Sequence, residues 1–185
     1  QICNSLPQGS DPLGGSLMLL QDSLDSGAAL AQFEQLYRKK PGMTLNCARL
    51  SENVPKNRYR DISPYDTTRV LIKGSRGDYI NANYVNMEIP GSGIVNRYIA
   101  AQGPLPNTCA DFWQMVWEQQ CRLVVMLTTE VEQGRVKCHR YWPDLYETMD
   151  FGNMQVTCVK EECTASFAFR EFTLVNMEVI DMCPQ

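Results

Sequence analysis

The sequence has no long apolar run, little basic charge and a single histidine. Its most apolar stretch, residues 123–127, is far shorter than the roughly 20 residues with which a helix crosses a bilayer, so we expect no membrane insertion. The 17 Lys and Arg residues are outnumbered by 21 Asp and Glu, which gives a net charge of -4. Because binding to nucleic acid needs a basic face that neutralises phosphates, we also expect no nucleic-acid partner.

Patterns typical of metal binding and disulfide frameworks are also missing. The eight cysteines contain no CxxC pair and His139 is the sole histidine, whereas structural zinc sites need clustered Cys and His ligands. A chain of 185 residues can form a core without disulfide support. We therefore expect reduced thiols in a cytoplasmic protein, with no structural metal. The cysteines are Cys3, Cys47, Cys109, Cys121, Cys138, Cys158, Cys163 and Cys183.

The composition that is present, 44% hydrophobic and 21% charged, is ordinary for one soluble domain. Residues 1–16 combine Gly and Pro with polar residues, which predicts a flexible leader or linker. Apolar residues at helical spacing from Ser16 predict an amphipathic helix that ends near residue 40. A second helix is predicted over residues 107–120, where Thr108 and Asp111 resemble a capping box.

Short β-prone runs, separated by Gly and polar turns, predict strands between and after these helices. Helices interleaved with strands indicate an α/β sheet domain. The predicted strands lie at residues 70–72, 79–83, 98–101, 123–128, 154–159 and 166–175.

Five blocks of sequence lie at residues 56–67, 78–82, 98–113, 124–129 and 134–143. They resemble the classical non-receptor protein-tyrosine phosphatases and occur in the same order as in that family. Residues 36–42 and 86–90 are most similar to the subfamily that carries FERM and PDZ modules. The resemblance implies that residues 17–178 form the N-terminal part of a phosphatase domain, a twisted mixed sheet flanked by helices, with the C-terminal portion missing. Residues 179–185 depart from the family as a tail.

The resemblance also implies a substrate site. Tyr59 matches the aromatic wall that stacks against phosphotyrosine, and Asp61 matches the carboxylate that accepts hydrogen bonds from the backbone of the substrate. Arg60 could favour acidic residues beside the phosphotyrosine. Glu132 and Lys137 match a charged pair that supports the active site, although a solvated pair on a hairpin is an equal alternative.

The catalytic residues of that family are not found. Its nucleophile lies in a His-Cys-x5-Arg loop, yet no cysteine here follows a histidine and none is followed by arginine six positions later. Asp144 occurs in a Trp-Pro-Asp sequence that spells the family's acid loop, but it directly follows a different conserved block, so we expect a surface turn residue. This chain is therefore predicted to be inactive alone.

Two functional hypotheses follow from this sequence. In the first, the parent protein hydrolyses phosphotyrosine in partner proteins through a cysteinyl-phosphate intermediate, without a metal or a cofactor. Upstream modules outside this chain could target it to the junction of membrane and cytoskeleton. In the second, the chain is a non-catalytic interaction fragment or a truncated product. We also expect it to be marginally stable and prone to aggregate, because a parallel sheet needs cover on both faces.

Overall fold

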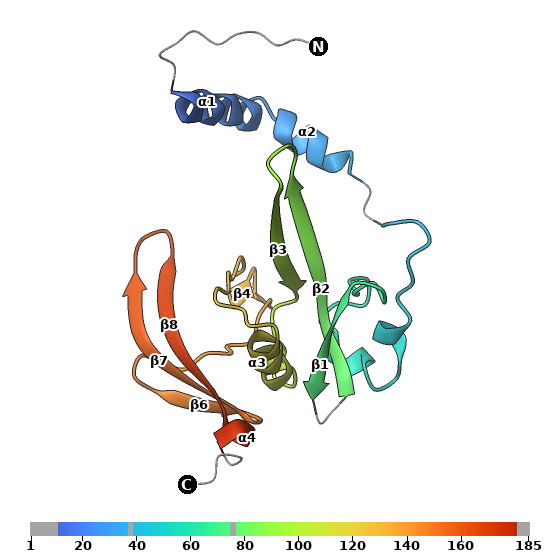
Figure 1. Ribbon diagram of the computed structural model, residues 1–185, viewed down its shortest axis with the longest axis vertical. Helices are drawn as coiled ribbons and strands as arrows, with labels where there is room; N and C mark the ends of the chain where they lie inside the picture. The colour runs from blue at the N-terminus through green and yellow to red at the C-terminus, as the bar shows by residue number, and fades with distance from the viewer. Residues whose placement is uncertain (1–10, 37–38, 75–76, 181–185) are drawn as a thin grey trace. The chain divides into compact units, whose positions relative to one another are not determined.

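The computed structural model describes residues 11–36, 39–74 and 77–180 (Figure 1). The chain divides into two compact units, residues 1–42 and 43–185. Most of the predicted leader and most of the predicted tail lie outside the described residues. None of the described helices is long and apolar enough to cross a membrane.

The first unit contains two helices where the sequence predicts one. Helix α1 (Pro12–Asp25) begins earlier than expected, because the Asp11 carboxylate accepts a hydrogen bond from the Leu13 N–H at 3.1 Å and Pro12 occupies the first turn. Helix α2 (Ala28–Glu34) follows. The break falls at Gly27, whose φ of 76° lies in the left-handed region that a continuous helix does not allow.

The second unit is mixed α/β, which confirms the predicted fold class. Its three sheets are all antiparallel, and among the described residues a parallel pairing occurs as the isolated bridge from Leu145 to Cys158. The sheets are formed by β1 (Arg69–Gly74), β2 (Gly77–Ile89) and β3 (Ile94–Ala101); by β4 (Val131–Glu132) and β5 (Arg135–Val136); and by β6 (Thr148–Phe151), β7 (Met154–Cys163) and β8 (Ala168–Asn176).

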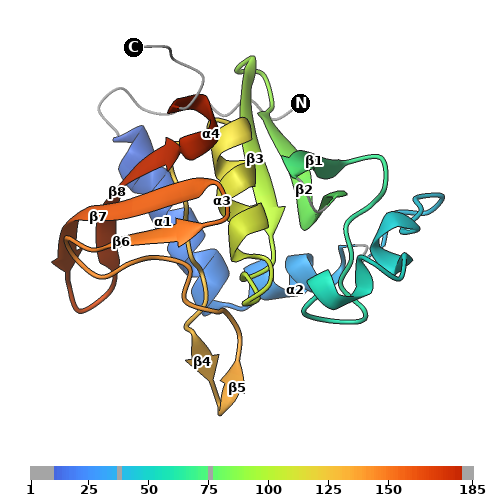
Figure 2. The same cartoon turned by 90° about the horizontal axis from the view of Figure 1, so that it is seen from below.

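Helix α3 (Cys109–Glu118) lies between the two larger sheets, as both views show (Figures 1 and 2). It falls within the predicted helix at residues 107–120 and joins a core to which Val70 of β1 and Val156 of β7 also belong. The Trp113 indole N–H donates to the Tyr141 carbonyl at 2.7 Å, so the polar atom of this buried ring is satisfied. Shorter helices are η1 (Cys47–Arg49), η2 (Val54–Lys56) and α4 (Met177–Ile180).

The predicted capping box at the start of α3 is wrong. The Thr108 hydroxyl does not cap the helix but accepts a hydrogen bond from the Leu105 N–H at 2.9 Å. The Asp111 carboxylate instead lies 3.2 Å from the ammonium group of Lys56. A partner from a distant segment therefore replaces the local contact that the sequence pattern favours.

The strand predicted at residues 123–128 is also wrong, because the structure has no strand there. Leu123, Val125 and Leu127 are exposed by 76%, 66% and 94%. A strand requires a neighbour that accepts and donates ladder hydrogen bonds, and no described segment pairs with this one. The high β-propensity of these residues is therefore not expressed as a strand.

Candidate substrate-recognition site

The loop that carries the predicted site residues begins at Lys56, whose side chain is buried. Its ammonium group lies 3.2 Å from Asp111 of α3 and donates a hydrogen bond to the Tyr79 carbonyl of β2 at 3.3 Å. The side chains of Lys56 and Asp111 are only 10% and 6% exposed, so water screens this ion pair weakly. The pair fixes the start of the loop to both the helix and the first sheet.

Asn57 and Asn81 hold the two ends of the loop. The Asn57 side-chain oxygen accepts hydrogen bonds from the Tyr79 hydroxyl at 2.5 Å and from the Asn81 amide at 2.9 Å. The Asn81 amide also donates to the Ile62 carbonyl at 3.0 Å. Burial raises the pKa of Tyr79 to about 12, so its hydroxyl remains a hydrogen-bond donor at neutral pH.

Gln102 satisfies the middle of the loop. Its side-chain oxygen accepts from the Arg58 N–H at 2.9 Å, and its side-chain amide donates to the Lys56 carbonyl at 2.8 Å. These bonds replace the pairing that an irregular backbone cannot supply for itself. Gln102 therefore acts as scaffold for the loop.

Tyr59 and Lys137 are brought together by this arrangement, although they are far apart in sequence. The Lys137 ammonium group lies 5.7 Å from the centre of the Tyr59 ring, within the range of a cation–π contact, and the ring is 40% exposed. Arg60 and Asp61 follow on the exposed side of the loop, where neither has a hydrogen-bond or ion-pair partner among the described residues. Their polar groups are available to a ligand.

Glu132 lies across the β4–β5 hairpin from Lys137. The two charged groups are 3.7 Å apart, and their side chains are 62% and 28% exposed, so the pair is worth only about 0 to 1 kcal/mol. The hairpin turns at Gln133 and Gly134, both with positive φ (48° and 74°), as a tight two-residue turn requires. It projects from the rest of the second unit (Figure 2).

Three cysteines whose pKa is raised by burial do not resemble nucleophiles. Burial raises the pKa of Cys109 to about 11, and it also raises the pKa of Cys121 and of Cys138. These thiols stay protonated at neutral pH, whereas a phosphatase nucleophile must be a thiolate. In the described part of the chain, no three side chains of His, Cys, Asp or Glu gather as a metal site.

Asp144 lies in a surface turn, as predicted. Its carboxylate pairs with the Arg140 guanidinium four residues earlier, and its side chain is 65% exposed. The Glu147 N–H donates to the Asp144 carbonyl at 2.9 Å, which closes the turn. The Asp144 carboxylate is therefore held at the surface by an arginine.

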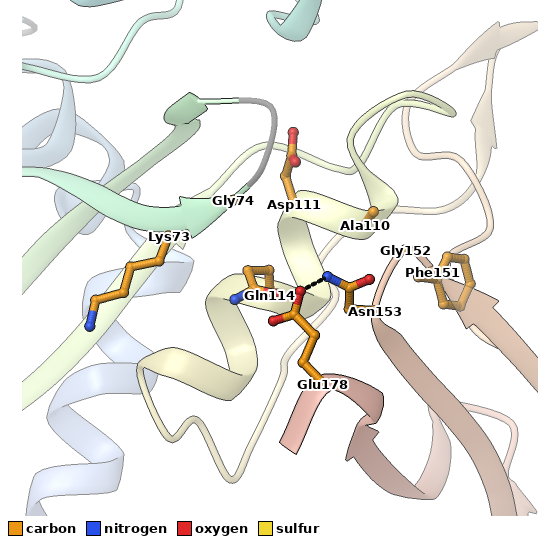
Figure 3. Close-up of a pocket in the computed structure, with 9 residues that line it drawn as sticks. All are labelled: Lys73, Gly74, Ala110, Asp111, Gln114, Phe151, Gly152, Asn153 and Glu178. Atoms are coloured by element: carbon orange, nitrogen blue, oxygen red, sulfur yellow. Dashed lines mark hydrogen bonds between the residues drawn. The ribbon is translucent and has the colours of Figure 1, made fainter. Parts of the chain in front are cut away.

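A surface hollow of about 260 Å³ lies elsewhere, where α3 meets the end of β1 and the β6–β7 turn (Figure 3). The Asn153 amide donates a hydrogen bond to the Glu178 carboxylate across it. None of the predicted site residues lines this hollow. It is lined by Lys73, Gly74, Ala110, Asp111, Gln114, Phe151, Gly152, Asn153 and Glu178.

The sequence did not reveal the roles of the residues that support the loop. Asn57, Arg58 and Lys56 stand inside the block that resembles the phosphatases, yet no role was predicted for them. Their contacts run to β2, α3 and the turn after β3, so no local spacing could reveal them. The one available signal was their position beside Tyr59.

Comparison with known proteins defines the class of protein to which this site belongs. A family model described as "Protein-tyrosine phosphatase" matches residues 53–182, and the chain belongs to that family. The match reaches beyond the predicted domain end at residue 178 and starts after the first unit.

Particular relatives narrow the assignment. The chain is 61% identical over 175 residues to tyrosine-protein phosphatase non-receptor type 4 of Mus musculus, covering 95% of this chain and 19% of that protein. It is 58% identical to tyrosine-protein phosphatase 1 of Caenorhabditis elegans (94% and 17%) and 38% identical to non-receptor type 13 of Homo sapiens (88% and 6%). The predicted N-terminal part of a non-receptor phosphatase domain of this subfamily is thereby confirmed. The chain spans about a fifth of the length of non-receptor type 4, the first of these relatives.

Proposed function

We propose that the parent protein of this chain is a cytoplasmic protein-tyrosine phosphatase that hydrolyses phosphotyrosine through a cysteinyl-phosphate intermediate. The chain supplies the substrate-recognition part of the site. The observation that carries the proposal is the exposed Tyr59 ring beside Lys137, on a loop whose two ends are fixed to the sheet and helix. This arrangement lies within the residues that match the phosphatase family model.

Tyr59, Arg60 and Asp61 then each have a binding role. The Tyr59 ring stacks against the phosphotyrosine ring, and the depth of the resulting pocket disfavours the shorter phosphoserine and phosphothreonine. The Asp61 carboxylate accepts hydrogen bonds from the substrate backbone, and Arg60 attracts acidic residues that flank the phosphotyrosine. Lys137, paired with Glu132, supports the wall from the neighbouring hairpin. The substrates are thus phosphotyrosine proteins.

The chain itself is proposed to be inactive. Cleavage of the ester needs a thiolate to attack phosphorus, a cradle of backbone N–H groups with an arginine for the phosphate oxygens, and an acid for the leaving phenol. None of the eight cysteines is followed by arginine at the sixth position. Recognition residues without that cradle cannot break the ester bond.

A phosphate-release assay tests both parts of the proposal. The 185-residue chain and a longer natural product that contains it are incubated with a phosphotyrosine peptide, a matched phosphoserine peptide and a small aryl phosphate. We expect turnover of the phosphotyrosine peptide and the aryl phosphate by the longer protein only. Phosphate release by the 185-residue chain would refute its inactivity, and an inactive longer protein would refute the phosphatase assignment.

The second candidate is a non-catalytic interaction fragment, which is favoured by the unpartnered Arg60 and Asp61 side chains. Calorimetry of the chain with a phosphotyrosine peptide discriminates between the two. Because the charged anchor for the phosphate is missing, we expect no heat at millimolar peptide. Saturable heat that is lost in Tyr59→Ala would instead establish the fragment as a binding module.

The cellular setting is part of the same proposal. The net charge of -4 supports an absence of nucleic-acid partners, and upstream modules outside this chain would provide targeting to membrane and cytoskeleton. Imaging of the chain and of the longer protein as fluorescent fusions tests this. We expect the chain to be diffuse in the cytoplasm and the longer protein to be enriched at the cell cortex.

A further inference from the structure

Arg58, the residue before the predicted aromatic wall, binds two segments that are distant from it in sequence. Its guanidinium donates hydrogen bonds to the carbonyls of Gly103 at 3.0 Å, Pro104 at 2.6 Å and Val136 at 3.3 Å. The first two carbonyls belong to the turn after β3, and the third belongs to β5, immediately before Lys137. One side chain therefore joins the recognition loop to both.

These two segments already meet closely without Arg58. A Cβ atom at Gly103 would lie 2.6 Å from the Lys137 carbonyl oxygen, so only glycine allows this approach. The His139 N–H donates to the Pro104 carbonyl at 2.8 Å, and the same carbonyl accepts from Arg58. Arg58 thus extends an existing backbone contact toward the loop, at the place where Tyr59 and Lys137 face each other.

Arginine is suited to this geometry in a way that lysine is not. Its planar guanidinium presents five N–H donors in fixed directions, and three of them are directed here to carbonyls on two segments. The described residues offer Arg58 no carboxylate partner. Since the carbonyls occupy its donors, its role is to set geometry.

We propose that Arg58 is a positioning residue, which locks the Tyr59 loop to the β4–β5 hairpin so that the aromatic wall and Lys137 keep one fixed spacing. The inference rests on the proposed phosphotyrosine-binding function of Tyr59. Loss of Arg58 frees the loop from the hairpin while Lys56, Asn57 and Gln102 still anchor the backbone. Each binding event must then order the Tyr59 ring at a cost in conformational entropy, so the affinity for phosphotyrosine falls.

The test compares Arg58→Lys with a matched control, Arg49→Lys, in the longer natural protein. Arg49 is exposed and has no side-chain hydrogen bond or ion pair among the described residues. For Arg58→Lys we expect KM for a phosphotyrosine peptide to rise by about tenfold with kcat unchanged, since a wall binds ground and transition states equally. Arg49→Lys should leave both constants unchanged. A purely structural role would instead lower the amount of folded enzyme, and thus apparent kcat, at constant KM.

Hydrogen exchange on the 185-residue chain provides a readout that does not require activity. In Arg58→Lys we expect faster exchange both in the loop at residues 57–62 and in residues 136–139, with exchange in α3 unchanged. Unchanged exchange at 136–139 overturns the inference, whether or not the parent protein is a phosphatase. An inactive wild-type protein with coupled exchange would refute the proposed function but retain Arg58 as the link.

Discussion

Two segments of the second unit differ in whether their backbone groups find hydrogen-bond partners. One is the loop that carries Tyr59, and the other is the segment at residues 123–128. In the loop, side chains of Gln102 and Asn81 provide the hydrogen bonds that an irregular backbone lacks. In the second segment, Leu127 is 94% exposed and no strand forms. The geometry of the Tyr59 loop thus depends on contacts within this chain, whereas the apolar segment pairs with no strand among the described residues.

Breaking the ion pair beneath the loop should have the largest effect. Lys56→Met leaves the Asp111 carboxylate buried without its 3.2 Å ammonium partner. Removal of one member of a buried pair costs about 3 to 5 kcal/mol, which is comparable to the stability of a marginal domain. We expect urea unfolding at a much lower midpoint, or loss of the near-ultraviolet circular dichroism of the core aromatic residues.

The matched control removes both charges. Lys56→Met combined with Asp111→Leu leaves no buried carboxylate and should recover a large part of the loss, because apolar residues can replace a buried pair at little cost. Equal midpoints for Lys56→Met and wild type would show that the pair does not anchor the loop.

Comparison of the predicted with the observed helices and strands shows which information the sequence contains. Helix α3 was predicted because its apolar residues repeat with the helix period and face the core. Strands β1, β2, β3, β7 and β8 were predicted, at least in part, from their β-prone residues. Strand β6 was missed, although Gly152, with a φ of 63°, marks the β6–β7 hairpin turn. Thr108 and Asp111 were misread since Lys56, far away in sequence, binds the carboxylate.

The site shows the same division. Family resemblance predicted Tyr59, Arg60 and Asp61 as substrate-binding residues, and the structure places Lys137 of the neighbouring hairpin beside Tyr59. The sequence could not show the contacts of Arg58, because the acceptors of its guanidinium are backbone carbonyls. Backbone acceptors leave no residue signature, so only the three-dimensional arrangement reveals them.

A smaller effect on stability is expected at Asp66, which lies just before β1 and binds the first residues of the second unit. Its carboxylate accepts hydrogen bonds from the Thr44 hydroxyl at 2.7 Å, the Asn46 N–H at 2.8 Å and the Cys47 N–H at 2.9 Å. The bond from Thr44, with those from the backbone, holds the pKa of Asp66 well below its usual range. Asp66→Asn should lower the free energy of unfolding by about 1 to 2 kcal/mol at pH 7, measured in urea.

The pH dependence of this loss identifies the charge as its cause. Because folding lowers the pKa of Asp66, the stabilisation is complete above the ordinary aspartate pKa of about 3.9 and is lost as the pH falls below it. The difference between wild type and Asp66→Asn should therefore shrink below about pH 4. Asp22→Asn, at an exposed position of α1, is the control and should change stability at neither pH. A difference that stays constant down to pH 2 would contradict the assignment.

The smallest effect is expected in the segment at residues 123–128. Substitutions there test directly whether this segment is less well packed than the Tyr59 loop. Leu127→Asp should change the free energy of unfolding by less than about 0.5 kcal/mol, because the side chain is 94% exposed and loses no packing. Met126→Asp, one residue earlier, removes a side chain that packs against the core and should cost several times more. Light scattering should show less aggregation for Leu127→Asp, since a charge interrupts an exposed apolar segment. Equal destabilisation by the two substitutions would mean that residues 123–128 are packed in solution, and the contrast with the Tyr59 loop would then disappear.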